Sequence, residues 1–94
     1  MNQPAGKPLV IRLYVAGQAA ISLRAASNLK QIDRDHFDGR CQIEIVDVFA
    51  APQRALADGI LVTPTLLKLS PEPAVRIIGD LSATERVIFS LGGE

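Results

Sequence analysis

The sequence is poor in cysteine, has no tryptophan and carries no net charge. Its 94 residues include one cysteine, Cys41, and no tryptophan, and 10 Lys and Arg residues balance 10 Asp and Glu residues. A single cysteine cannot form an intrachain disulfide or a multi-thiolate metal site. A net charge of zero argues against a protein dedicated to nucleic acids, because such proteins normally carry a basic excess.

Long hydrophobic runs are also lacking. The longest, residues 9–16, is interrupted by Arg12 and is far shorter than the ~20 residues that a membrane-spanning helix needs. The polar stretch over residues 1–8 lacks the apolar region of a secretory signal peptide. We therefore expect a cytoplasmic protein with no membrane or nucleic-acid partner, made of a flexible tail over residues 1–7 and a single domain over residues 8–94.

What is present is a regular alternation of strand-like and helix-like segments. Residues 9–15 and 42–48 are rich in β-branched side chains and are expected to be strands. Between them, Ala25, Leu29 and Ile32 recur at helical spacing, which predicts a helix from residue 21 to about residue 35. A strand, a helix and a second strand at this spacing are typical of a right-handed parallel crossover unit.

The second half predicts shorter elements. Pro52 favours a short helix over residues 53–57, because proline is tolerated in the first turn. Residues 66–69 and 75–78 are expected to be the strands of an antiparallel hairpin, joined by a proline-rich turn. Residues 82–85 have the spacing of a capping box that begins a final helix. The predicted order, β-α-β-α-β-β-α, is that of an α/β, thioredoxin-like domain.

A thioredoxin-like enzyme carries two cysteines at the start of its first helix, where the helix N-terminus lowers the thiol pKa. Here that stretch, residues 17–22, contains no sulfur, and Ser22 is expected to cap the helix. Cys41 lies far away in the sequence and is expected to be a small apolar side chain. A redox protein that works through Cys41 alone is the enzymatic alternative.

Other side chains that could carry chemistry are isolated. The one histidine, His36, falls at the end of the first predicted helix, where a structural or solvated role is expected. Four acidic residues have no evident partner and are expected to be solvated charges: Asp33, Asp35, Glu44 and Asp47. The sequence therefore predicts no catalytic residue, no cofactor and no metal ion, which favours a protein that is not an enzyme.

Prolines mark the second half of the chain. Pro64 directly precedes a predicted strand and cannot donate a hydrogen bond within a sheet, so it belongs at the strand's start. Thioredoxin-like folds place a cis proline at this junction, and we expect the Thr63–Pro64 bond to be cis. Pro71 and Pro73 follow within ten residues. The three prolines are candidates for a slow conformational switch, and a stiff hairpin loop is the alternative for Pro71 and Pro73.

Several segments together resemble the KaiB family of circadian clock proteins. They are residues 13–17, 22–25, 45–48, 52–53, 60–66 and 76–82. The likeness runs from about Lys7 to Leu91, and the sequences Thr-Pro-Thr at 63–65 and Ile-Gly-Asp-Leu-Ser at 78–82 are its most specific parts. It implies a non-enzymatic regulator that is thioredoxin-like when it binds its partner. The family's resting form, usually tetrameric, has the order β-α-β-β-α-α-β, so fold switching and self-association to a dimer or tetramer are further expectations.

The resemblance implies the N-terminal ATPase ring of a KaiC-like protein as the partner. KaiA is the weaker prediction, because no acidic extension follows Glu94 and because Glu44 stands where a basic residue is more usual. From their charge, Arg24, Arg76 and Asp80 are candidate partner contacts. The alternative from another class is a sensory domain related to those of clock-output histidine kinases, which stay thioredoxin-like and compete for the same ring.

Overall fold

The structure, a computed structural model, describes residues 8–92. The seven elements follow the order β1 (Val10–Val15), α1 (Ala20–His36), β2 (Gln42–Asp47), α2 (Pro52–Ala57), β3 (Thr65–Ser70), β4 (Val75–Ile78) and α3 (Thr84–Ser90). The predicted order β-α-β-α-β-β-α is therefore confirmed, and the alternative order is not the one seen here. The predicted tail over residues 1–7 lies outside the described residues.

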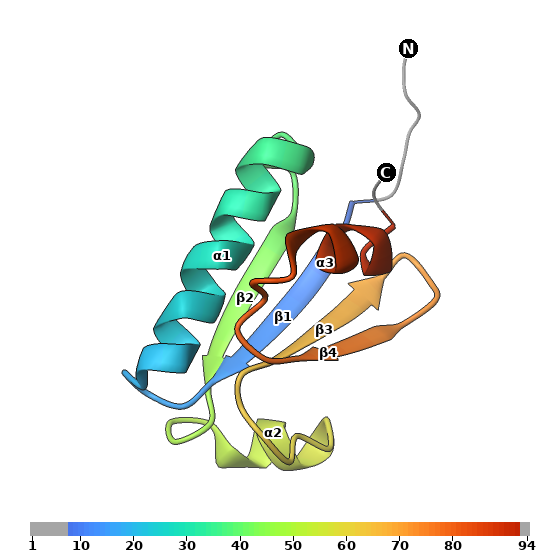
Figure 1. The fold of residues 1–94 in the computed structure, drawn as a ribbon. Helices are drawn as coiled ribbons and strands as arrows, with labels where there is room; N and C mark the ends of the chain where they lie inside the picture. Colours follow the sequence, from blue (N-terminus) through green and yellow to red (C-terminus); the bar gives the residue numbers. More distant parts are fainter. Residues whose placement is uncertain (1–7, 93–94) are drawn as a thin grey trace.

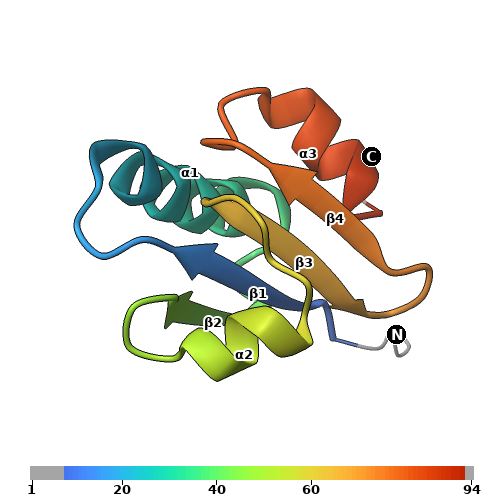
Figure 2. The same ribbon diagram turned by 90° about the horizontal axis from the view of Figure 1, so that it is seen from below.

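One mixed sheet organises the molecule, with the strands in the order β2-β1-β3-β4. β1 runs parallel to β2 and antiparallel to β3, and β3 forms the antiparallel hairpin with β4. α1 and α3 cover one face, and α2 lies on the other (Figures 1 and 2). The central strand β1 is accordingly buried on both faces, which explains why its sequence is almost continuously apolar.

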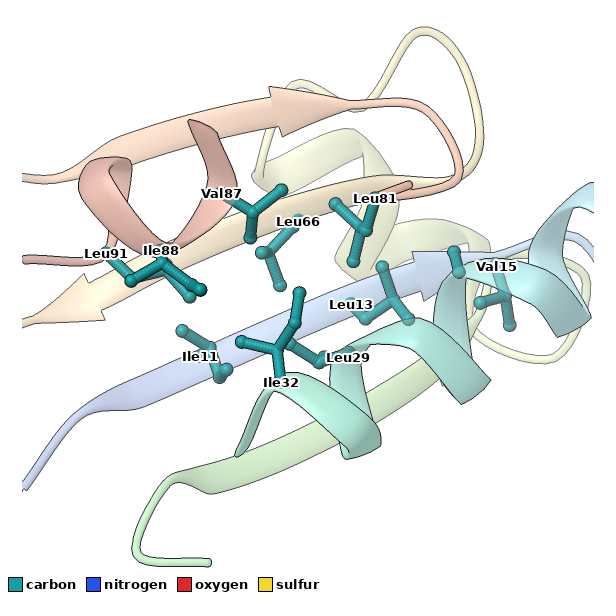
Figure 3. Close-up of a cluster of buried hydrophobic side chains, with 11 residues drawn as sticks. Ile11, Leu13, Val15, Leu29, Ile32, Leu66, Leu81, Val87, Ile88 and Leu91 are labelled. Carbon is teal, nitrogen blue, oxygen red and sulfur yellow. The ribbon is translucent and has the colours of Figure 1, made fainter. Parts of the chain in front are cut away.

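The main core lies between the sheet and the helices α1 and α3 (Figure 3). Ile11, Leu13 and Val15 alternate along β1 and face Leu29 and Ile32 of α1, as the helical spacing predicted. Ala25 of α1, Leu66 of β3 and four side chains toward the C-terminal end complete the cluster: Leu81, Val87, Ile88 and Leu91. A smaller cluster on the opposite face joins α2 to the sheet and consists of Tyr14, Val46, Ala55 and Leu67.

The capping box predicted at the start of α3 is wrong. The N-cap residue is Ala83, and among the described residues no side chain caps this helix end. The reason is a turn directly before the helix, in which the carboxylate of Asp80 accepts the N–H of Ser82 at 3.0 Å. Ser82 is held in this tight turn outside the helix, so it does not pair reciprocally with Glu85.

Ser22 also differs from its predicted role as a helix cap. α1 begins at Ala20, which places Ser22 inside its first turn. The buried hydroxyl accepts the N–H of Ala16 at 3.0 Å instead. Ser22 therefore stabilises the chain between β1 and α1 rather than the helix end.

Pro64 occupies the place that the sequence predicted. It is buried directly before β3, the Thr63–Pro64 bond is cis, and its carbonyl accepts the N–H of Gly79 at 3.0 Å. The bonds before Pro71 and Pro73 are cis as well. That the three prolines act in a conformational switch stays a prediction.

Candidate protein-binding surface

Large apolar side chains are exposed around α2. They belong to the helix and to the loops on both sides of it, and their exposed fractions range from 47% to 94%: Phe49, Leu56, Leu61 and Val62. We call these four residues the α2 surface. Figure 1 shows this segment at one end of the molecule. Four large apolar side chains left exposed on one segment, residues 49–62, make this segment a candidate interaction site for another macromolecule.

The loop before α2 holds Phe49 in a defined place. Asp47 Oδ1 accepts the N–H of Phe49 at 3.0 Å and that of Gly17 at 3.1 Å. The Phe49 ring lies over Gly17, where an added Cβ would come within 3.5 Å of it. Gly17 also has a φ of +54°, which glycine adopts at little cost. Phe49 is therefore exposed while its backbone is anchored to Asp47 at the end of β2, which also binds Gly17 just after β1.

Beneath α2, the sheet and the helix are joined by charged groups that meet at Glu44. Arg54 donates to both carboxylate oxygens of Glu44 at 2.8 Å, a bidentate arrangement of the kind that makes Arg–carboxylate pairs strong. The Nε of Arg12 donates to Oε1 of the same carboxylate at 2.9 Å. Glu44 on β2 thus binds one arginine from β1 and one from α2.

A second carboxylate, Asp58, extends this arrangement behind α2. Its Oδ2 accepts from Nη1 of Arg12 at 2.9 Å and from the Tyr14 hydroxyl at 2.6 Å. The same hydroxyl lies 3.1 Å from the carbonyl oxygen of Arg54. We call these five residues the α2 network: Arg12, Tyr14, Glu44, Arg54 and Asp58. It connects β1, β2, α2 and the residue that follows α2.

The network changes the titration of its members. Hydrogen bonds from Arg54 and Arg12 lower the pKa of Glu44 to about 2. The hydroxyl of Tyr14, followed by Arg12, holds the pKa of Asp58 below its usual value. Burial, together with the neighbouring Asp58 carboxylate, raises the pKa of Tyr14. Both carboxylates are therefore ionised and Tyr14 is neutral at pH 7.

Acid is expected to destabilise the domain through these carboxylates. A carboxylate whose pKa is lower in the folded state than in the unfolded state stabilises the fold above its unfolded pKa, about 4.3 for Glu. That contribution is lost as the pH falls from this value toward the pKa of about 2 of folded Glu44. Urea unfolding midpoints between pH 7 and pH 2.5 measure the effect. Glu44→Gln should make the decline shallower; a slope identical to that of the wild type would contradict the assignment.

Three of the four acidic residues expected to be solvated have specific partners. Besides Glu44 and Asp47, Asp33 is only 9% exposed and accepts the N–H of Cys41 at 3.0 Å. Asp35 is exposed as expected. The prediction failed because the partners lie far away in the sequence or on the backbone, where neighbouring residues give no sign of them.

The predicted contact residues do not form one site. Arg24 of α1 lies near Asp80, with 3.7 Å between Nε and Oδ2, and Asn28 donates to the Asp80 carbonyl at 2.8 Å. Arg76 is elsewhere: from β4 it donates to the carbonyls of Asp58 and Gly59 at 2.7 and 3.1 Å. Arg24 and Asp80 thus belong together, whereas Arg76 contacts the turn that ends α2 and so borders the α2 surface.

Cys41 has the environment of an unreactive thiol. Its side chain is half-buried just before β2, and burial and the adjacent Asp33 raise its pKa to about 12. Since the thiolate is the reactive species, this argues against the single-cysteine redox alternative. Within residues 8–92, no group of His, Cys, Asp and Glu side chains could hold a metal ion, and no helix is long and apolar enough to cross a membrane.

Solved structures with the same arrangement of helices and strands identify the fold class. The N-terminal domain of SasA from Synechococcus elongatus matches with a TM-score of 0.76 and 22% identity, covering 98% of this chain and 90% of that one. Chloroplastic thioredoxin z matches with a TM-score of 0.74 and 26% identity, covering 90% and 76%. The molecule is thus of the thioredoxin-like class, with a first helix that begins without the cysteine pair of the redox enzymes.

Comparison of sequences gives the family. The KaiB domain model matches residues 12–92. The circadian clock oscillator protein KaiB of Nostoc punctiforme is 47% identical over 87 residues, covering 93% of this chain and 84% of the relative. KaiB of Trichodesmium erythraeum is 46% identical over 88 residues, covering 94% and 85%. The chain belongs to the KaiB family.

Proposed function

We propose that this protein is a non-enzymatic regulator, acting in the cytoplasm, that binds a KaiC-type ATPase ring through the α2 surface. The observation that carries the proposal is the exposure of four large apolar side chains on and around one short helix in a KaiB family member. Aromatic and large aliphatic side chains that fill pockets in a partner supply most of the binding energy of protein interfaces. Clock oscillator proteins among the relatives support a regulatory rather than catalytic role.

The direct test is binding between the purified protein and a KaiC-type ring. Biolayer interferometry against the immobilised ring, with nucleotide present, gives the affinity, and size-exclusion chromatography gives the composition of the complex. We expect saturable binding by the wild type. Absence of binding at micromolar concentrations, with any nucleotide, would contradict the proposal.

Arg24 and Asp80 are proposed as a second contact, at the rim of the interface. Arg24 is 60% exposed and Asp80 is half-buried, and their 3.7 Å separation makes a weak ion pair that contributes little to folding. Arg24→Glu places a like charge beside Asp80 and is expected to weaken ring binding about two- to tenfold, mainly through slower association, with an unchanged thermal midpoint. Arg76→Glu should weaken binding at least as much, because Arg76 also holds the end of α2. Wild-type affinity in both variants would remove these contact assignments.

We further propose that the fold described here is the partner-binding form and that this chain also populates the family's second fold. The support comes from family membership and from the short β3–β4 hairpin, whose second strand has four residues. NMR of the free protein tests it: a second set of resonances for residues 60–90, without the cross-strand contact between Leu67 and Arg76, would report the other form. A single set with this contact at all concentrations would contradict it. Light scattering in the same samples tells monomer from dimer and tetramer.

A sensory domain of the SasA kind is the second candidate, favoured by the TM-score of 0.76. At 22% identity this likeness describes the fold alone, while the KaiB relatives reach 47%. The two candidates differ in the free protein, because such a sensory domain is expected to hold a single thioredoxin-like fold.

A further inference from the structure

We propose that Glu44 is a positioning residue for partner binding: by binding Arg54 and Arg12 together it fixes the rotation of α2 on the sheet and so holds Leu56 outward on the α2 surface. The choice of partner rests on the proposed function. The effect on α2 does not, because it is a property of the free protein. Three features of the structure carry the inference.

The first feature is that α2 is short and buries little of its own surface. It has six residues and is about 9 Å long, and isolated helices shorter than ~12–15 residues are marginal in water. Its N-cap residue is Ala51, and among the described residues no side chain caps that end. Of the helix residues, Ala55 is the one that is buried. The methyl group of Ala55 defines the rotation of the helix poorly, so the polar contacts of Arg54, through its side chain to Glu44 and through its carbonyl to Tyr14, define it instead.

The second feature is the geometry of the Arg54 side chain. Its two terminal nitrogens bind the two oxygens of Glu44, each at 2.8 Å, so both the position and the plane of the guanidinium are defined. Successive residues of a helix are rotated by about 100°, so Leu56, two residues on, points to the opposite side from Arg54. Directing Arg54 toward the sheet therefore directs Leu56 to solvent, where it is 79% exposed.

The third feature is that Glu44 is shared. Oε1 accepts hydrogen bonds from both Arg12 and Arg54. Arg12 retains a second carboxylate, Asp58, but within residues 8–92 Glu44 is the one acidic side chain that forms an ion pair with Arg54. Without the charge of Glu44 the two guanidinium groups would repel each other. Loss of this carboxylate therefore removes the side-chain anchor of Arg54 and pushes its guanidinium away from the sheet, while the contact of the Arg54 carbonyl with Tyr14 remains.

Hydrogen exchange of the free protein, measured by NMR, tests the effect on α2. The reporters are the amides of Asp58 and Ile60, which donate to the carbonyls of Arg54 and Ala55. Glu44→Gln is expected to speed their exchange at least about tenfold more than that of the β1 and β3 amides, whose exchange follows only the loss of global stability. If Glu44 acted only on global stability, exchange of the α2 reporters and of the β1 and β3 amides would speed up by the same factor. Arg54→Lys keeps the positive charge but loses the bidentate contact with Glu44, so it should speed the exchange of the same amides by an intermediate factor.

The matched control is Glu72→Gln, which removes the same charge from an exposed position in the β3–β4 turn. It should leave both exchange and binding unchanged.

Ring binding by Glu44→Gln is expected to weaken about three- to tenfold through faster dissociation. Unchanged exchange at α2, in both Glu44→Gln and Arg54→Lys, would overturn the inference, and so would looser α2 with wild-type affinity. A wild type that binds no ring while Glu44→Gln loosens α2 would overturn the proposed function instead.

Discussion

Leu61→Asp is expected to weaken binding to a KaiC-type ring by about 30- to 1,000-fold. Leu61 is 94% exposed in the loop after α2, so its side chain contributes almost nothing to the core of the free protein. If it enters an apolar pocket of the partner, a carboxylate in its place must be desolvated without a counter-charge, and central apolar anchors of interfaces are worth ~2–4 kcal/mol. Biolayer interferometry with the immobilised ring measures the loss.

The matched control for Leu61→Asp is Phe89→Asp. Phe89 is 81% exposed but lies on α3, on the opposite side of the sheet from α2 (Figure 2). Both variants should unfold at the wild-type urea midpoint, and Phe89→Asp should bind like the wild type. Equal weakening by the two substitutions would show that apolar exposure in general, and not the α2 surface, determines the affinity.

Leu13→Ala is expected to cost about 2–5 kcal/mol of unfolding free energy, a large share of the 5–15 kcal/mol typical of a small domain. Leu13 is fully buried on β1, on the face of the sheet that α1 and α3 cover (Figure 3). Its loss leaves a cavity whose walls belong to several elements and cannot easily collapse. Urea denaturation measures the change as a lower midpoint at an unchanged slope.

Leu23→Ala serves as the control for this second prediction. Leu23 lies on α1 but is 51% exposed, and substitutions at such positions usually change stability by less than about 0.5 kcal/mol. A comparable loss in the two variants would mean that the main core does not lie between the sheet and α1.

The order of the elements could be predicted because each one leaves a local signature. The spacing of Ala25, Leu29 and Ile32 defined α1, and all three are buried. Pro52 marked the start of α2 and Pro64 the start of β3. The helix caps could not be predicted in the same way. A serine near a helix start has several possible partners, and the turn around it decides which one it binds.

The binding surface was harder to predict than the fold. Arg24 and Asp80 were chosen by charge, and the structure places them within 3.7 Å of each other. The apolar residues of the α2 surface were missed, because a helix of six residues is too short for a periodic pattern to tell its exposed side from its buried side. The apolar run of residues 60–62 was the available signal, since it lies outside any predicted element and before a proline.

The sequence by itself determined the α/β class, the neutral net charge, the lack of a cysteine pair and the membership of the KaiB family. Those properties depend on composition, local periodicity and short motifs, all of which are visible along the chain. The tertiary structure alone decided the role of Glu44, which binds residues 32 and 10 positions away, and the raised pKa of Cys41. Ion pairs and burial depend on which segments the fold brings together. Such contacts leave no mark on the neighbouring residues.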